Sequence, residues 1–186
     1  MKKILGLSLI CLLLVGCAGW RANTTNTYTG ASFGLKAAVE TVKPSCEQDA
    51  ISIENCDKLK SRYNVAVTSY KSAGNVLILA LTTEDAAQKK MLIEQFDTIL
   101  GQFRITTLEL VQLIQEIQAL QTHTAMPKKL IIGPDVITII IAAIEAIVKI
   151  APQIVSWISD WATTDTQIQD MVLKIQAAQA AVLRWE

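Results

Sequence analysis

The chain of 186 residues has little of what usually marks an enzyme or a cofactor-binding protein. A single histidine, His123, excludes most metal centres built on imidazole, and no E-x-x-H pair is present to support a di-iron bundle. The eight glycines are scattered, and none falls in the G-x-x-x-x-G-K or G-x-G-x-x-G order of phosphate-binding loops. No G-x-S-x-G sequence occurs in a strand-turn-helix context. We therefore expect no enzyme, no cofactor and no metal site.

An excess of basic charge is also missing. Lys and Arg number 17, as do Asp and Glu, and loss of Lys2 and Lys3 with a leader would leave 15 basic against 17 acidic residues, a net charge near −2. Nucleic-acid binding depends on neutralising phosphates, so nucleic acid is not an expected partner. The acidic residues stand mostly singly on polar faces, which gives no paired carboxylates for acid/base catalysis.

The first seventeen residues have the organisation of an export signal. Two lysines precede an apolar run of about twelve residues, and a small residue precedes Cys17. The run is shorter than the roughly 20 apolar residues that cross a bilayer as a helix. The segment Leu14-Val15-Gly16-Cys17 resembles the lipobox of bacterial lipoproteins. This resemblance covers only these residues, and implies that 1–16 are removed and that Cys17 is acylated on its sulfur and its amine.

The same resemblance implies where the protein is found. Several acyl chains on Cys17 would make a firm membrane anchor. Ala18, in place of Asp, implies transfer to the periplasmic face of the outer membrane in a diderm bacterium. Trp20 follows closely, where an indole is favoured at the headgroup level. We expect residues 17–32, rich in Thr, Asn and Gly, to be a flexible tether, and residues 33–186 to form the folded domain.

Two cysteines remain beyond the anchor, Cys46 and Cys56. In an oxidising compartment an even pair indicates a disulfide. A reactive thiol pair is the alternative, although the spacing is not C-x-x-C.

Hydrophobic spacing predicts an all-α antiparallel bundle of four long helices after one short helix. The short helix should end before Pro44, since proline disfavours the helical conformation of the residue preceding it. Asp57 is the expected N-cap of the second helix, and Thr82 to Asp85 should form the next turn and cap. In the second helix Gly74 suggests a close helix crossing, and a heptad spacing of four and three residues is kept by Leu59, Tyr63, Ala66, Tyr70, Ala73, Leu77 and Ala80. The expected apolar stripe of 85–121 is Leu92, Phe96, Ile99, Phe103, Leu110, Ile114, Ile117 and Leu120. The expected apolar face of 166–185 is Ile168, Met171, Val172, Ile175, Ala178, Gln179 and Val182. The predicted ranges are 33–43, 57–81, 85–121, 135–161 and 166–185.

The helix 135–161 is predicted to be the most buried, because about two thirds of its circumference is apolar. Glu145 and Lys149 are spaced i, i+4 on its polar strip; they form either a solvated edge or an interaction surface. A membrane-spanning reading of 136–158 is the alternative, although each of its uncharged runs has only nine residues. With a lipid at Cys17, a span there would resemble the single-chain spanins of phage lysis.

Three functions therefore remain open. The first is a non-enzymatic, lipid-anchored envelope lipoprotein that presents a helical surface to a protein partner or to its membrane. The second is a carrier that holds an apolar ligand within the bundle. The third is a membrane-disrupting lysis protein, which requires that 136–158 span the bilayer.

Overall fold

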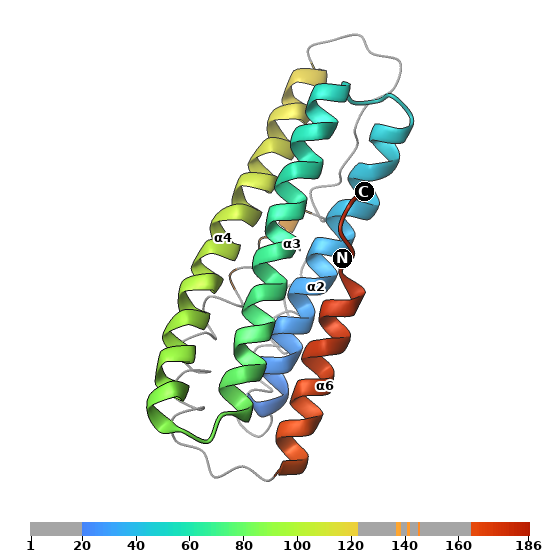
Figure 1. Cartoon of the computed structure of the whole chain (residues 1–186). Coiled ribbons are helices and arrows are strands. Elements are labelled where there is room, and N and C mark those ends of the chain that lie inside the picture. Colours follow the sequence, from blue (N-terminus) through green and yellow to red (C-terminus); the bar gives the residue numbers. More distant parts are fainter. Residues whose placement is uncertain (1–19, 123–136, 139–140, 142–144, 146–164) are drawn as a thin grey trace, which may run out of the picture.

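A computed structural model describes residues 20–122, 137–138, 141, 145 and 165–186. Four long helices lie in this part of the chain (Figure 1). The all-α bundle predicted from the sequence is confirmed for these residues. The helices are α2 (Trp20–Glu47), α3 (Ile53–Thr82), α4 (Ala86–Thr122) and α6 (Asp165–Ala181).

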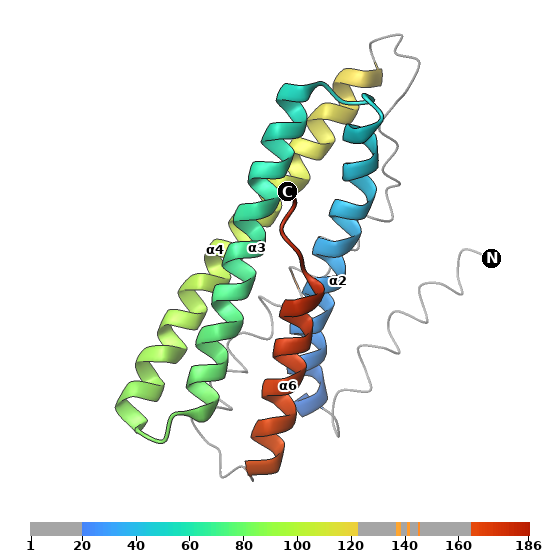
Figure 2. The same cartoon turned by 45° about the vertical axis from the view of Figure 1, so that its right-hand side comes forward.

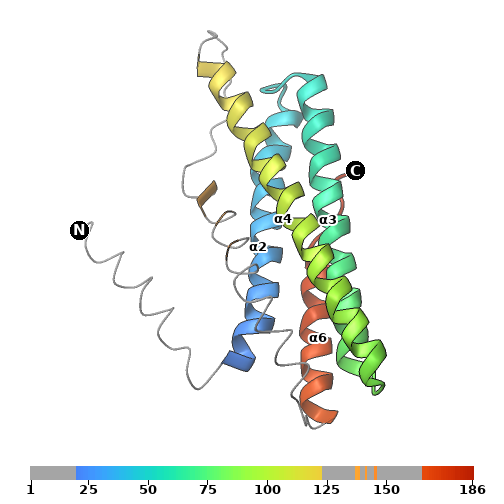
Figure 3. The ribbon, with the colours of Figure 1, turned by 90° about the vertical axis from the view of Figure 1, so that its left-hand side faces the viewer.

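Helix α3 is the central element of the described bundle. It contacts α2, α4 and α6, and it runs opposite in direction to all three, as the colour order along the chain shows (Figures 1 and 2). Helix α6 lies beside α2, whereas α4 lies on the other side of α3 (Figure 1). Seen from that side, α4 crosses in front of the bundle (Figure 3). The predicted heptad spacing of α3 is confirmed, because each of its members is buried. These residues are Leu59, Tyr63, Ala66, Tyr70, Ala73, Leu77 and Ala80.

Helix α2 corrects two expectations at the N-terminal side. It begins at Trp20, so residues 20–32, expected to be tether, are helical. Their Thr, Asn and Gly residues have low helix propensity, but packing overrides it, because an apolar stripe faces the core. The 28-residue helix is also far longer than the short one predicted. The buried stripe is Tyr28, Ala31, Leu35, Ala38 and Val42.

The end of α2 is set by backbone hydrogen bonds rather than by Pro44, which lies inside the helix. The N–H of Ala50 donates to the carbonyl of Ser45 (2.9 Å), and that of Asp49 to the carbonyl of Cys46 (3.1 Å). This is the bonding pattern of a Schellman motif, and Asp49 takes the left-handed conformation that it needs (φ 55°). Pro44 has no N–H to donate to the carbonyl of Glu40, and the helix nevertheless continues to Glu47.

The starts of α3 and α4 confirm one predicted cap and correct another. The hydroxyl of Ser52 accepts the N–H of Asn55 (3.4 Å), so Ser52, not Asp57, caps α3. The cap of α4 falls within the predicted segment Thr82–Asp85: the carboxylate of Asp85 accepts the N–H of Gln88 (2.7 Å), and the helix begins at Ala86. Ser52 and Asp57 are both residue types that favour the N-cap position, so sequence alone did not separate them. The earlier start was missed because Ile53, the first residue of α3, is apolar and exposed.

The predicted apolar stripe of α4 is correct only in part. Phe96, Phe103, Leu110, Ile114 and Ile117 are buried, but Leu120 is exposed. Leu92 and Ile99 are half-buried, whereas their neighbours turn fully inward. At these three positions the buried residue is the next one along the chain, and a step of one residue turns a helix by about 100°. The buried neighbours missed from the sequence are Ile93 and Leu100.

Gly74 of α3 marks a close helix approach, as expected from the sequence. A Cβ atom at this position would lie 2.1 Å from the Tyr28 hydroxyl oxygen and 2.6 Å from Nε2 of Gln179. Helices α2 and α6 therefore converge on α3 at this point. The Tyr28 hydroxyl cannot easily move, because it donates to the carbonyl of Tyr70 (2.7 Å) and its ring stacks on that of Tyr70.

Replacing Gly74 by alanine is expected to destabilise the fold by about 1–3 kcal/mol, because overpacking and displacement of Tyr28 outweigh the gain in helix propensity. Gly101 provides a matched control, since it is also in mid-helix but has nothing within 4 Å of its added Cβ. Gly101→Ala should stabilise by about 0.5–1 kcal/mol. Urea unfolding followed by circular dichroism compares the two variants. Equal effects of the same sign would refute the close approach.

The predicted helix 135–161 falls mostly outside the described residues. Within it, Ile137 and Ile141 are half-buried and pack on the core, whereas Thr138 and Glu145 are exposed. This agrees with the predicted placing of Thr138 and Glu145 on one polar strip. Lys149, Pro152 and the question of a span over 136–158 lie outside the described residues.

Candidate functional site

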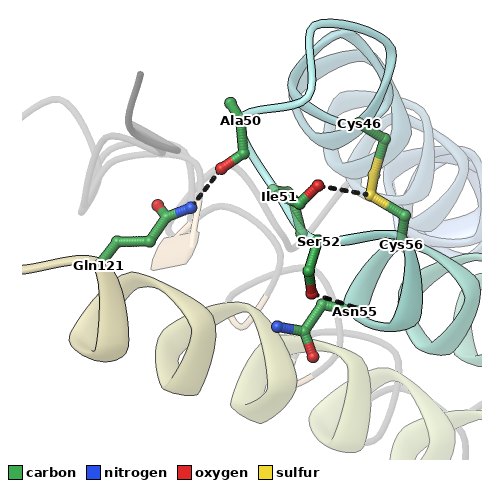
Figure 4. Close-up of a disulfide and its surroundings, with 7 residues drawn as sticks. All are labelled: Cys46, Ala50, Ile51, Ser52, Asn55, Cys56 and Gln121. Atoms are coloured by element: carbon green, nitrogen blue, oxygen red, sulfur yellow. Dashed lines mark hydrogen bonds between the residues drawn. A yellow bond between two sulfur atoms is a disulfide. The ribbon is translucent and has the colours of Figure 1, made fainter. Parts of the chain in front are cut away.

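The disulfide-linked corner between α2 and α3 is the most constrained polar feature of the described structure. Cys46 and Cys56 are bonded to each other, with their Cα atoms 5.8 Å apart, so the predicted disulfide is confirmed. Figure 4 shows Gln121, near the end of α4, directed at the corner. Its side-chain amide donates to the carbonyl of Ala50 at 2.5 Å. We call residues 46–56 and 120–122 together the stapled end.

The stapled end leaves two large apolar side chains in solvent. Ile53, the first residue of α3, is 80% exposed, and Leu120 of α4 is 64% exposed. Ile51, between the disulfide and the cap, is buried. The corner is thus held by a disulfide, a Schellman motif, the Ser52 cap and the hydrogen bond from Gln121. It nevertheless exposes Ile53 and Leu120. A rigid surface of this kind loses little entropy when a partner binds.

Charged side chains lie next to this end along the α3–α4 seam. Arg62 and Glu109 form an ion pair between the two helices, at 2.5 Å. Lys58 bonds to Glu54 at 2.6 Å, and this hydrogen bond, with the lysine charge, lowers the pKa of Glu54. An open depression of about 430 Å³ follows the seam. It is lined by Lys58, Arg62, Glu109, Gln112, Leu113 and Glu116.

A smaller cavity of about 260 Å³ lies beside the C-terminal segment. Trp185 packs edge-on against Tyr63 there, and the Tyr63 hydroxyl donates to the carbonyl of Leu183 (2.9 Å). Asn64 fixes the segment by bonding both the N–H and the carbonyl of Trp185 (2.8 Å each). The cavity is below the roughly 300–1,000 Å³ of small-molecule sites, and Lys36, Lys43 and Arg184 line it. It does not suit an apolar ligand.

Tyr28 and Tyr70 form the most buried polar pair in the described part. Each hydroxyl donates to the other residue's carbonyl, at 2.7 Å and 3.0 Å, and the ring centroids are 4.3 Å apart. Burial raises the pKa of both phenols, and the neighbouring Tyr70 raises that of Tyr28 further. Burial also raises the pKa of Tyr63, to about 12. Phenols with raised pKa values stay protonated at neutral pH and are poor acid/base catalysts.

A G-x-S-x-G spacing lies within α2. Gly30-Ala31-Ser32-Phe33-Gly34 has the G-x-S-x-G spacing of a nucleophile elbow. It lies in the middle of α2, however, and Ser32 is buried beside Tyr70. A nucleophile elbow exposes its serine at a strand-to-helix turn, so this segment serves packing rather than catalysis.

The remaining sequence-predicted sites are only partly within view. Glu145 is exposed, whereas its partner Lys149, the lipidation site Cys17 and the lone His123 lie outside the described residues. Among the residues that the structure describes, no three His, Cys, Asp or Glu side chains are grouped to hold a metal. Sequence reasoning missed Gln121 and the Tyr28–Tyr70 pair, since both depend on contacts between distant parts of the chain.

Helix α3 has the length and composition of a membrane span within the described residues. Its most apolar stretch has a mean hydropathy of 1.2, and half of that stretch is buried in the bundle. The same helix contacts three others, so its apolar face is accounted for as the bundle core.

The chain matches no protein-family model, no curated protein and no solved structure in comparisons of sequence and fold.

Proposed function

We propose that this chain is a non-enzymatic lipoprotein of the cell envelope, attached to a membrane through lipid on Cys17, that presents a helical surface to a protein partner or to that membrane. The observation that carries the proposal is the lipobox-like Leu14-Val15-Gly16-Cys17 behind an export signal. Ala18 supports the periplasmic face of the outer membrane as its location in a diderm bacterium. The disulfide between Cys46 and Cys56 suits an oxidising compartment of this kind.

The stapled end and the α3–α4 seam are the surface that best suits a protein partner. Exposed Ile53 and Leu120 supply apolar contacts, and the Arg62–Glu109 and Lys58–Glu54 pairs supply charges around them. Apolar residues within a polar rim are the usual composition of a protein interface.

The other two candidate functions depend on helix 135–161. The apolar-ligand carrier needs a cavity against that helix, and the spanin-like lysis protein needs 136–158 to span the bilayer. Charged side chains line the two cavities described above, and they also line two further depressions beside Asp57. None of these four favours an apolar-ligand carrier.

Cell fractionation of a matched pair tests the anchor. The native protein is expected in the membrane pellet, from which detergent releases it and high salt does not. A variant in which residues 1–17 are replaced by an ordinary cleavable export signal should appear in the soluble periplasmic fraction, because it lacks the acyl chains. Persistence of this variant in the pellet would favour the spanning alternative, and a soluble native protein would contradict the anchor.

A further inference from the structure

We infer that the bundle stands upright on its membrane, with the α3–α4 turn at Thr82–Asp85 against the lipid headgroups and the stapled end held away from them. The inference rests on the proposed lipid anchor at Cys17 and adds an orientation to it. In this orientation the α3–α4 end contacts the bilayer surface. The stapled end is then the part of the molecule that a second protein can reach.

The first step is the short distance between the lipid and α2. Only two residues separate Cys17 from Trp20, where α2 begins. Three Cα–Cα steps of about 3.8 Å place the Cα of Cys17 within about 11 Å of that of Trp20. A helix that starts this close to an anchor cannot wander as it could on a long tether, so the first turn of α2 is held near the bilayer.

The second step is the register between α2 and α3. Tyr28 lies beside Tyr70 and Gly74, and Cys46 is bonded to Cys56, so the two helices run antiparallel along their whole contact. Because both helices rise by about 1.5 Å per residue, Trp20 is level with about residue 80 of α3. Helix α3 ends at Thr82. The anchor is therefore at the α3–α4 end of the bundle, and the start of α6 lies at this same end (Figures 1 and 2).

The third step is the chemistry of the two ends. Thr82 and Thr83 are polar and Glu84, Asp85 and Asp165 are acidic, so this end does not insert among acyl chains. The lipid on Cys17, and not the charge of this end, holds it over the headgroups. The stapled end is separated from this turn by the length of α3, 30 residues or about 45 Å. Ile53 and Leu120 are thus presented about 45 Å from the bilayer, beyond the reach of the lipid.

Site-specific quenching on the reconstituted native protein tests the orientation. A fluorescent amino acid replaces either Glu84, in the α3–α4 turn, or Glu47, in the last turn of α2; both positions are exposed. The protein is placed in vesicles of phosphatidylethanolamine and phosphatidylglycerol that carry a contact quencher on the headgroups. We expect strong loss of fluorescence at position 84 and none at position 47 beyond that of a water-soluble dye. Equal quenching at both positions, or stronger quenching at 47, overturns the inference.

A linker insertion separates this inference from the anchor itself. About twelve Gly and Ser residues inserted after Ala18 form a flexible coil, so the protein should stay on the vesicles while the difference between positions 84 and 47 shrinks. A difference that survives the insertion would show that another surface orients the bundle, which overturns the inference and leaves the anchor intact. Failure of the native protein to stay on the vesicles at all refutes the anchor, and the orientation with it.

Discussion

Raising the pH above 10 is expected to destabilise the fold steeply, because every tyrosine of the chain is buried. Tyr28, Tyr63 and Tyr70 are 3%, 1% and 1% exposed, and the chain has three tyrosines in all. Burial raises their pKa values in the folded state above the value near 10 of an unfolded chain. The stability that they confer is therefore fully present below pH 10. It is lost as the pH rises towards the pKa values of the folded state, and the pKa of Tyr63 there is about 12.

The size of the effect follows from proton linkage. Each tyrosine that is ionised in the unfolded chain and neutral in the folded one costs about 1.4 kcal/mol of stability per pH unit, so three cost about 4 kcal/mol per unit above pH 10. Denaturant titrations from pH 9 to about 12 measure this slope, and the absorbance of tyrosinate should appear together with the loss of helical circular dichroism. Tyr63→Phe is the matched control, with a slope of two protons instead of three. Tyrosinate that forms near pH 10 in a protein that remains helical would contradict the burial.

Removal of the disulfide is expected to cost about 3 kcal/mol, through the loop closed between residues ten apart in sequence. The double variant Cys46→Ser, Cys56→Ser should unfold at lower urea concentration than the oxidised protein. Reductant should shift the oxidised protein to the same midpoint and leave the variant unchanged. The Gln121 bond to Ala50 and the Ser52 cap still hold the corner locally, so we expect a folded variant.

Two observations would contradict a structural disulfide at this corner. One is an unchanged urea midpoint in the double variant. The other is a reductant-sensitive midpoint in the double variant itself, which would place the responsive thiol elsewhere in the chain.

The helical class and the buried faces of α3 and α6 could be predicted from the sequence, because helix packing requires apolar residues every three or four positions. The heptad of α3 and the position of Gly74 are read from residues three or four apart. The disulfide was predictable by elimination, since only Cys46 and Cys56 remain if Cys11 and Cys17 belong to the proposed signal and anchor.

What the sequence did not predict depends on contacts between distant segments. Residues 20–32 have a composition typical of a tether, and they are helical because Tyr28 and Ala31 pack against α3. Pro44 is a strong local signal to stop, but the Schellman motif at Asp49 and the disulfide bond at Cys46 set the end of α2 three residues later. Gln121 stands at the predicted end of its helix, and its burial depends on the bond of its side-chain amide to the carbonyl of Ala50.

The stapled end illustrates both cases. Its cysteines were found from the sequence, whereas the exposure of Leu120 was not, because the buried residue at the end of the stripe is the polar Gln121 and not the apolar Leu120. An error of one residue turns a helix by about 100°, which is enough to move a side chain from the core to the surface. The apolar surface offered to a partner therefore became visible only with the fold.

The mass of the intact protein, purified from its native membrane, tests the central proposal most directly. The account predicts a polypeptide that begins at Cys17, with added mass for a diacylglyceryl group and an amide-linked acyl chain, and two further hydrogens missing for the Cys46–Cys56 disulfide. A full-length, unmodified polypeptide of 186 residues would contradict the lipid anchor and, with it, the upright orientation of the bundle.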